Sequence, residues 1–311
     1  METQHVPVLL AEAIEQLNCK PNGIYLDATL GSGGHAYTIL KDNPQIKWLI
    51  ALDCDEDAIK QARSRLEPFS HKTFIFQANF ITLRAILKEL AVKELDGILI
   101  DLGVSSLQLE NPNRGFSFRL KGPLDMRMDK RLSSTAFDLV NTYEASQLEN
   151  LFRTYGEERW SARIARALVR ERKKAPIADT VHLSSIVTTA IPPAHRPRKI
   201  HPATKTFQAL RIVVNQELDN LTKVIEEGID LLAHQGRLCI ISFHSMEDRI
   251  VKHHFRKSTT RYIYPDGVRA PGRLQAGTLR IITKKPITPQ PEEVSNNPRA
   301  RSAKLRVAEK V

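Results

Sequence analysis

The feature that most constrains this fold is an alternation of short apolar runs with helical patterns in the first hundred residues. The runs are typical of buried strands and lie at residues 23–26, 48–52, 73–76 and 97–100. Apolar residues at helical spacing follow the first three runs. Such alternation predicts an α/β fold with a parallel sheet covered by helices on both faces.

Polar residues follow the predicted strands, at the edge where an open parallel sheet binds its ligands. They are Asp27, Asp53, Asn79 with Phe80, and Asp101. Each acid alone has a simpler explanation as the cap of the next helix. Four strand ends in series instead favour an adenosine cofactor. Asp53 would accept hydrogen bonds from ribose hydroxyls, Phe80 would lie against the adenine, and Asp101 would accept from the adenosine or the substrate.

A glycine-rich turn, Gly31-Ser32-Gly33-Gly34-His35, joins the first strand to the next helix. Glycine lets the backbone turn tightly and approach a ligand closely, and the helix N-terminus offers N–H groups that lack partners. With Ala36 the turn satisfies the pattern G-x-G-x-x-A, which makes a nicotinamide dinucleotide one candidate ligand.

The residue at the end of the first strand, Asp27, favours a different ligand. A carboxylate at this place would repel a pyrophosphate, but it could pair with the ammonium group of a methionine moiety. His35 and the N–H groups of Gly33 and Gly34 could then hold the carboxylate of that moiety. We therefore predict S-adenosylmethionine as the cofactor.

The strand–helix alternation stops after residue 104, and helical patterns follow without strands. We predict an inserted helical domain over residues 105–200 and a ligand-binding domain formed by residues 1–104 and 201–311. In its second part we expect a long helix over 204–232, a strand over 237–243 and a helix opened by a capping box at Ser245–Asp248. An antiparallel pair over 279–283 and 303–307 should complete the sheet. Gly156 is placed to end one helix of the insertion.

The formal net charge of +11 favours a polyanionic partner through counterion release. Much of the positive charge lies in the predicted insertion, at Arg159, Arg163, Arg166, Arg170, Arg172, Lys173 and Lys174. This segment predicts a surface that faces RNA. The alternative is a helical cap whose charged face is merely solvated.

Other classes of protein are disfavoured. No window approaches eighteen uninterrupted apolar residues, which argues against a membrane span, and the N-terminus lacks the pattern of a signal peptide. The three cysteines, Cys19, Cys54 and Cys239, are far apart and flanked by apolar residues. We interpret them as reduced, buried thiols of a cytoplasmic protein, and we see no cluster of metal ligands. A homodimer is left open.

Motifs spread over almost the whole chain make a more specific case. The chain closely resembles the bacterial small-subunit ribosomal RNA cytosine-N4 methyltransferases. The matching segments are His5–Leu10, Gly31–His35, Asp101–Leu109, Arg114–Phe118, Gly122–Asp129, Tyr155–Arg159, His201–Ala209, Ile241–Arg249 and Asn297–Ser302.

The resemblance implies a class I, Rossmann-like methyltransferase domain with an inserted helical domain. It implies methylation of N4 of a decoding-centre cytidine in the 16S rRNA of the small ribosomal subunit. The cofactor positions that it implies are Gly33, Gly34, His35, Asp53, Phe80, Asp101 and Gln108, to which our own interpretation adds Asp27.

The exocyclic amine of cytosine is a poor nucleophile because its lone pair is delocalised into the ring. Acceptors for its two protons and alignment with the methyl group would activate it. Many amino-methyltransferases place an acid or Asn, two prolines and an aromatic residue after the fourth strand, but this chain has Asp101-Leu102-Gly103-Val104-Ser105-Ser106. We expect Asp101 to be catalytic, with backbone carbonyls of residues 102–105 as further acceptors. Phe116, Phe118 or His244 would contact the cytidine, and His244 could equally be a local structural residue.

Three functions therefore remain to be compared. A cytosine-N4 rRNA methyltransferase explains both the strand-end residues and the basic insertion. A nicotinamide oxidoreductase explains the glycine turn alone. A non-catalytic RNA-binding or assembly protein needs the basic surface but not the strand-end residues.

Overall fold

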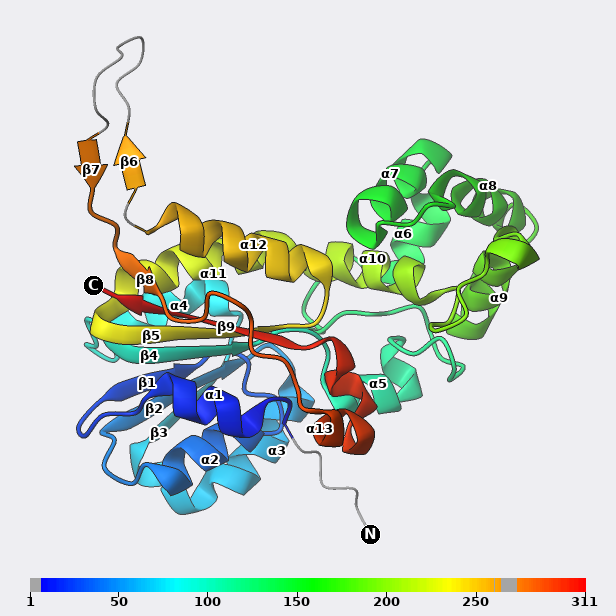
Figure 1. The fold of residues 1–311 in the computed structure, drawn as a ribbon. Coiled ribbons are helices and arrows are strands. Elements are labelled where there is room, and N and C mark those ends of the chain that lie inside the picture. The colour runs from blue at the N-terminus through cyan, green and yellow to red at the C-terminus, as the bar shows by residue number, and fades with distance from the viewer. Residues whose placement is uncertain (1–6, 260, 264–272) are drawn as a thin grey trace. The chain divides into compact units, whose positions relative to one another are not determined.

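The computed structural model describes residues 7–259, 261–263 and 273–311, and the chain divides into two compact units (Figure 1). Unit 1 comprises Met1–Gly103 and Leu218–Val311, and unit 2 comprises Val104–Glu217. The first two residues of the motif His5–Leu10, like the N-terminal residues judged for a signal peptide, lie outside the described residues.

Unit 1 is built on a seven-stranded sheet with the order β3-β2-β1-β4-β5-β9-β8. Its first five strands in this order are parallel, whereas β9 is antiparallel to both of its neighbours. This order with its reversed strand is typical of class I methyltransferases, so the predicted fold class is confirmed. The strands are β1 Ile24–Asp27, β2 Trp48–Asp53, β3 Thr73–Gln77, β4 Leu95–Asp101, β5 Leu232–Ser242, β8 Leu279–Ile281 and β9 Lys304–Lys310.

Helices cover both faces of this sheet (Figure 1). The helices α1 Leu10–Leu17, α2 Gly34–Asp42 and α3 Glu56–Leu66 share one buried cluster with the strands, and α4 Leu83–Glu89, α11 Glu217–Leu231 and α12 Ser245–Lys257 share the other. Successive strand residues alternate between the two clusters, as Leu49 and Ile50 do, because side chains of a strand point to opposite faces. A helix α13 Pro291–Asn296 and a two-stranded pair, β6 Arg261–Ile263 with β7 Arg273–Gln275, complete the unit.

Unit 2 is helical around a core of its own. Its helices are α5 Ser106–Glu110, α6 Ala136–Thr142, α7 Ala145–Gly156, α8 Ser161–Arg172, α9 Thr180–Ala190 and α10 Thr204–Asn215. The side chains that bury this core recur at helical spacing, as at Leu148, Leu151 and Phe152 of α7.

The long helix predicted over residues 204–232 is wrong, because the chain breaks it into α10 and α11. Gln216, between them, has the left-handed backbone conformation with φ 52°, which an α-helix cannot contain. Since α10 packs in the core of unit 2, that unit extends to Glu217 and not to residue 200 as we predicted. Its start at Val104 lies one residue before the predicted start.

One predicted helix end is confirmed, at Gly156, and one predicted helix cap is wrong, at Ser245. Gly156 is the last residue of α7, and Glu157, with φ 46°, is the left-handed cap. A Cβ on Gly156 would lie 2.8 Å from the carbonyl oxygen of Lys205, so the glycine permits close packing of α7 on α10. At α12 the cap is His244 and not Ser245, and Glu247 closes the capping box.

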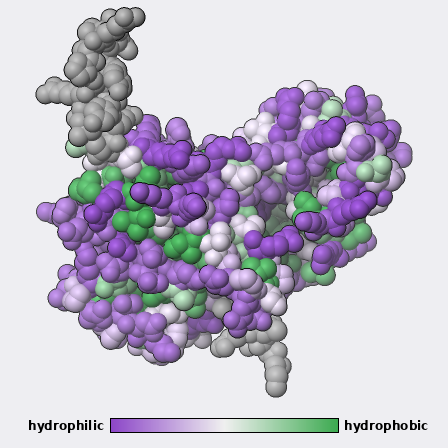
Figure 2. Space-filling model, in the orientation of Figure 1, coloured by the Kyte–Doolittle hydropathy of each residue, from purple (hydrophilic) through white to green (hydrophobic). Residues whose placement is uncertain are grey.

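The three cysteines are free thiols, but only Cys239 is buried, while Cys19 and Cys54 are half-buried. Hydrophilic side chains predominate on the face drawn in Figure 2, and hydrophobic ones gather over β8 and β9. In the described part of the chain, no helix combines the length and apolar character that crossing a membrane requires.

Candidate cofactor site

Three predicted acids meet at the carboxyl edge of the sheet. Asp27 ends β1 and pairs in register with Ala51 of β2 and with Leu99 of β4. Asp53 and Asp101 lie two residues further along those neighbouring strands. Because the three strands are parallel, the three carboxylates lie at one edge of unit 1, as predicted.

Asp53 holds the glycine turn. Its Oδ2 accepts a hydrogen bond from the N–H of Gly31 at 2.7 Å, and its Oδ1 accepts one from the N–H of Asp55 at 2.8 Å. Burial raises the pKa of Asp53 to about 6, although these backbone donors oppose the shift. The carboxylate thus fixes the ligand-facing loop in addition to any ligand contact.

Asp27 is almost completely buried at the base of the turn. Its Oδ1 accepts the N–H of Thr29 at 3.2 Å, and its Oδ2 has no partner among the described residues. Burial raises the pKa of Asp27 to about 7, and the charge of Asp53 contributes in the same direction. A buried acceptor without a partner is costly, which indicates a place for a donor from outside the chain.

Asp101 lies next to His35. The Nδ1 atom of His35 is 3.8 Å from Oδ2 of Asp101, and its Nε2 is 3.2 Å from the carbonyl oxygen of Val8. The Oδ1 atom of Asp101 is buried and has no partner in the described chain. Burial first, and then the charges of Asp27 and Glu247, hold the pKa of Asp101 well above its usual range.

The raised pKa values of the three carboxyl groups indicate which charge a ligand of this site should carry. Carboxyl groups gathered in a buried place repel one another and resist ionisation unless a cation joins them. The edge therefore favours a positively charged ligand and disfavours a pyrophosphate. This fits S-adenosylmethionine, which carries an ammonium and a sulfonium group, better than a nicotinamide dinucleotide.

The glycines of the turn have different parts. Gly33 has φ 80° and precedes α2, and its N–H donates to the carbonyl oxygen of Leu30 at 2.8 Å. That N–H therefore has a partner within the turn, and contact of Gly33 with a ligand carboxylate stays a prediction. We find no acceptor for the N–H of Gly34 among the described residues, which leaves this donor for a ligand.

The remaining predicted cofactor residues have local structural roles. Phe80 begins a short 3-10 helix, Phe80–Thr82, and packs half-buried against the core of unit 1. Gln108 belongs to unit 2, where its side chain accepts the N–H of Ser105 at 3.1 Å in a capping box. Their contact with a cofactor stays a prediction.

The three residues predicted to contact the base also have structural contacts within the chain. His244 caps α12, its Nδ1 accepts the N–H of Glu247 at 3.4 Å, and its Nε2 lies 3.0 Å from Oε1 of that residue. Phe116 is buried in the core of unit 2. Phe118 is half-buried and stacks on His201, with ring centroids 4.5 Å apart and an interplanar angle of 15°.

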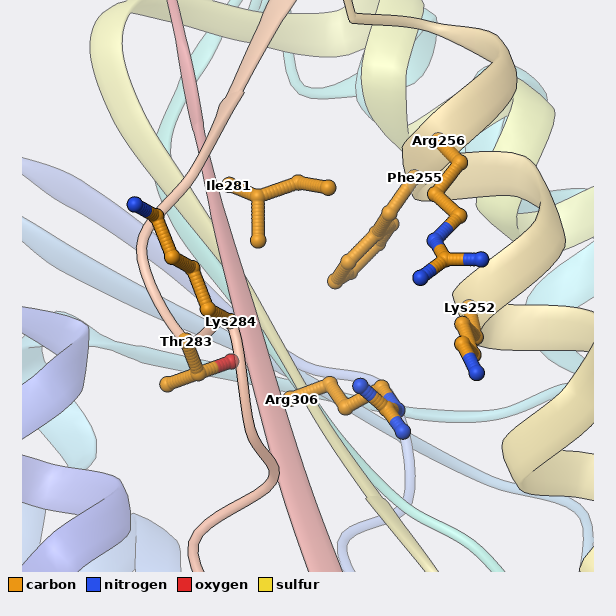
Figure 3. Close-up of a pocket in the computed structure, with 7 residues that line it drawn as sticks. All are labelled: Lys252, Phe255, Arg256, Ile281, Thr283, Lys284 and Arg306. Carbon is orange, nitrogen blue, oxygen red and sulfur yellow. The ribbon is translucent and has the colours of Figure 1, made fainter.

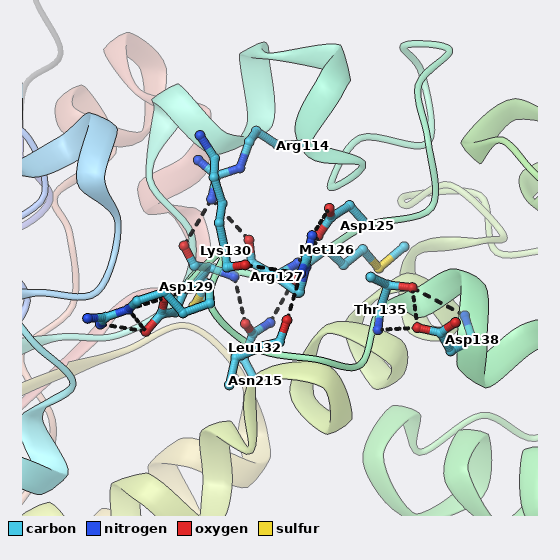
Figure 4. Close-up of polar contacts among 12 residues, drawn as sticks. Arg114, Asp125, Met126, Arg127, Asp129, Lys130, Leu132, Thr135, Asp138 and Asn215 are labelled. Atoms are coloured by element: carbon cyan, nitrogen blue, oxygen red, sulfur yellow. Dashed lines mark hydrogen bonds and ion pairs between the residues drawn. The ribbon is translucent and has the colours of Figure 1, made fainter.

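Two features escaped the sequence analysis. Thr29 links the ends of β1 and β4, because its Oγ1 accepts the N–H of Asp101 at 2.6 Å. In unit 2, a network orders the loop after α5 (Figure 4): Asp125 and Arg127 pair at 2.8 Å, and Asn215 accepts the N–H of Met128 at 2.7 Å. The sequence could have indicated the pair of Asp125 and Arg127, because an acid stands two residues before an arginine within a predicted loop.

Part of the predicted basic segment forms the exposed face of α8, whereas Arg159, Lys173 and Lys174 flank this helix. Arg163, Arg166 and Arg170 recur on this face and are exposed. Their guanidinium groups have no partners among the described residues. By contrast, Arg172 donates to the carbonyl oxygen of Val140 at 2.8 Å, and Lys174 pairs with Glu171 at 2.9 Å. Three arginines are therefore available to a partner.

Comparison with known proteins decides the family. The sequence profile of the MraW methylase family matches residues 2–311. The chain belongs to the MraW methylase family. Three relatives named ribosomal RNA small subunit methyltransferase H come from Syntrophus aciditrophicus, Halothermothrix orenii and Carboxydothermus hydrogenoformans. They are 47%, 48% and 46% identical to this chain, over 99%, 99% and 100% of its length and 98%, 99% and 99% of theirs. The predicted family is thus confirmed.

Solved structures resemble this MraW family member more distantly. An rRNA methylase from Streptococcus thermophilus is 12% identical, with a TM-score of 0.43 over 97% of this chain and 93% of the other.

Proposed function

We infer that this protein transfers a methyl group from S-adenosylmethionine to N4 of a decoding-centre cytidine in 16S rRNA. Membership of the MraW methylase family supports the methyl transfer, and the name of the relatives supports the rRNA of the small subunit as substrate. The structural observation that carries the inference is the pair of buried oxygens, on Asp27 and Asp101, that lack partners in the described chain at the edge of a class I sheet.

The residues of unit 1 would divide the work of holding the cofactor. Asp27 would accept from its ammonium group and the N–H of Gly34 would donate to its carboxylate. Asp53 would accept from the ribose, since a carboxylate oxygen that takes one N–H can accept a second hydrogen bond. Phe80 would lie against the adenine. When bound, the cofactor supplies a methyl group that a nucleophile can take from sulfur, which leaves as a thioether.

Asp101 would act on the amine of the cytidine. An acceptor at one N4 proton draws the nitrogen away from planarity, so that its lone pair becomes available. The raised pKa of Asp101 means that the carboxyl group ionises readily only when positive charge is close, as it would be while the amine is methylated, and the carboxylate would then take the proton that N4 loses. His35, 3.8 Å from Asp101, would keep the carboxyl group in place.

Unit 2 would contact the RNA. The arginine face of α8 suits the phosphates that flank the target, because such contacts position a nucleic acid without reading its sequence. A cytidine must leave its stack before an enzyme can reach N4, which agrees with a substrate in a loop or single-stranded segment.

The experiment that tests this function incubates the full-length protein with small ribosomal subunits that lack the modification and with labelled S-adenosylmethionine. Label should enter 16S rRNA at one cytidine, and mass mapping should place it on N4. Label at another position, or tight binding of NAD in place of S-adenosylmethionine, would overturn the inference.

Asp101→Asn tests the catalytic role. The amide cannot become an anion, so turnover should fall by at least about a hundredfold, while the affinity for S-adenosylmethionine should change by less than about tenfold. Full turnover in Asp101→Asn with unchanged cofactor affinity would remove Asp101 from the mechanism.

A further inference from the structure

A cavity of about 340 Å³ lies between α12 and the β8–β9 side of unit 1 (Figure 3). It takes no part in the cofactor site. Its lining residues are Lys252, Phe255, Arg256, Ile281, Thr283, Lys284 and Arg306. Four of these seven residues are cations and none is an acid, so the cavity carries a concentrated positive charge.

Three of the cations gather at one side of the cavity. Figure 3 shows the charged groups of Lys252, Arg256 and Arg306 near one another, whereas the ammonium group of Lys284 points away. Arg306 is only 7% exposed, and its Nε donates to Asp248 at 2.6 Å. Asp248 also accepts from Lys304 at 3.2 Å, so one carboxylate is shared by two cations and the three groups together keep a net positive charge.

A simpler explanation accounts for only part of this arrangement. Cations in the last turn of a helix offset the negative end of its dipole, and Arg256 lies in the last turn of α12. Lys252 lies before that turn, and Arg306 belongs to β9. Lys252 and Arg256 are four residues apart, where like charges repel, and neither has an acidic partner among the described residues. An anion from outside the chain would relieve this repulsion.

The other lining groups indicate the class of anion. Phe255 and Ile281 give the cavity an apolar part, and the only hydroxyl, on Thr283, already accepts the N–H of Val307 at 2.8 Å. The lining therefore offers cationic donors, whose contacts with nucleic acids are mostly to phosphates, and no uncommitted neutral polar side chain. Contacts of this kind bind a nucleic acid by its backbone.

We propose that this cavity binds a backbone phosphodiester of the RNA substrate. The proposal rests on the proposed function, since it takes RNA as the substrate. It adds to the arginine face of α8 a second phosphate contact, carried by the methyltransferase domain itself.

The test compares two variants of the full-length protein. Lys252→Gln/Arg256→Gln removes two exposed cations of the cavity, and Lys88→Gln/Lys93→Gln removes two exposed cations, one in α4 and one just after it. The probe is a 16S rRNA segment that carries the decoding centre, with Kd measured by fluorescence anisotropy from low to high KCl. We expect the cavity variant to bind about tenfold more weakly at low salt, with a salt slope smaller by about 1, and the control to change by less than about twofold.

Equal losses in the two variants would overturn the proposal, because total charge would then explain them. A free phosphorylated compound is the other source of the same ligand chemistry. If RNA affinity is unchanged while pyrophosphate raises the Tm of the parent protein but not of the cavity variant, the site takes such a compound and the proposal falls.

Two further measurements keep the result clear. Affinity for S-adenosylmethionine should be equal in all variants, which excludes a folding defect, and Lys252→Arg/Arg256→Lys should restore RNA affinity because it retains the charge. Methyl transfer by the parent protein to small subunits is measured separately. Absence of methyl transfer would refute the proposed function. The comparison of RNA affinities would still test whether the cavity binds RNA.

Discussion

Asp27 shows at the scale of one residue how the fold prepares a site for a cation. Its buried carboxyl group has one oxygen held by Thr29 and one without a partner in the described chain. In the ligand-free protein this group keeps its proton to a pH of about 7, against about 4 in an unfolded chain. The folded state thus binds more protons, so this residue's contribution to stability falls as the pH rises through that window.

Cofactor affinity should depend on pH in the opposite direction and rise as the pH rises. If an ammonium group pairs with ionised Asp27, affinity for S-adenosylmethionine should be about fivefold higher at pH 7 than at pH 6, with proton release on binding below pH 7. Calorimetry in buffers of different ionisation enthalpy measures both quantities. Asp27→Asn should flatten the dependence, and an unchanged pH profile in that variant would argue against the pairing.

Asp53 offers a second prediction about a single residue. Asp53→Ala removes the acceptor of the Gly31 N–H, so that amide should exchange with solvent at least about tenfold faster, and cofactor affinity should fall. Hydrogen exchange followed by NMR measures the first effect. Asp42→Ala, at an exposed position on α2, should leave the exchange of Gly31 unchanged.

At the scale of elements, the close contact of α7 with α10 predicts that Gly156→Ala lowers stability. Gly156→Ala places a Cβ 2.8 Å from a backbone oxygen of α10, so the helices must separate. We expect a loss of about 1–3 kcal/mol in the free energy of unfolding. Urea denaturation measures this change. Thr154→Ala, on the exposed side of α7, should change it by less than about 0.5 kcal/mol.

The elements also show what the sequence can and cannot predict. The four strands of the first hundred residues were found because each is an apolar run; the sheet buries β1, β2 and β4 on both faces, and β3, at its edge, is half-buried. The break between α10 and α11 was missed because Gln216, which adopts the left-handed conformation, is neither Gly nor Asn. The cap of α12 was assigned one residue late, since serine is the commoner capping residue and histidine is not among the preferred ones.

At the scale of the whole molecule, the charge of +11 should be expressed in RNA binding. Replacing Arg163, Arg166 and Arg170 by Gln should weaken binding to small-subunit rRNA by at least about tenfold and flatten its salt dependence. Binding titrations at several KCl concentrations measure both. The matched variant replaces Lys41, Lys88 and Lys93, three exposed cations of unit 1. Equal affinity in the two triple variants would show that α8 has no special part.

The site was predictable to the extent that it depends on strand ends. Asp27, Asp53 and Asp101 meet because parallel strands finish at one edge, which follows from the pattern alone. The hydrogen-bond partner of each backbone N–H cannot be predicted from the strand pattern. Only the three-dimensional turn reveals that Gly33 donates to Leu30, or that Thr29 joins two strands.

The pairing of β4 with β5 has a consequence for how this chain is made. Asp101 of β4 lies opposite Ile241 of β5. Therefore β4 can pair with β5 only after the whole of unit 2 has been synthesised. The last strand, β9, then fills the gap between β5 and β8. Contacts so distant in sequence form late and slowly. A growing chain would therefore hold β3, β2, β1 and β4 in a partial sheet whose β4 edge stays open until β5 is made, and β9 would complete the sheet after that.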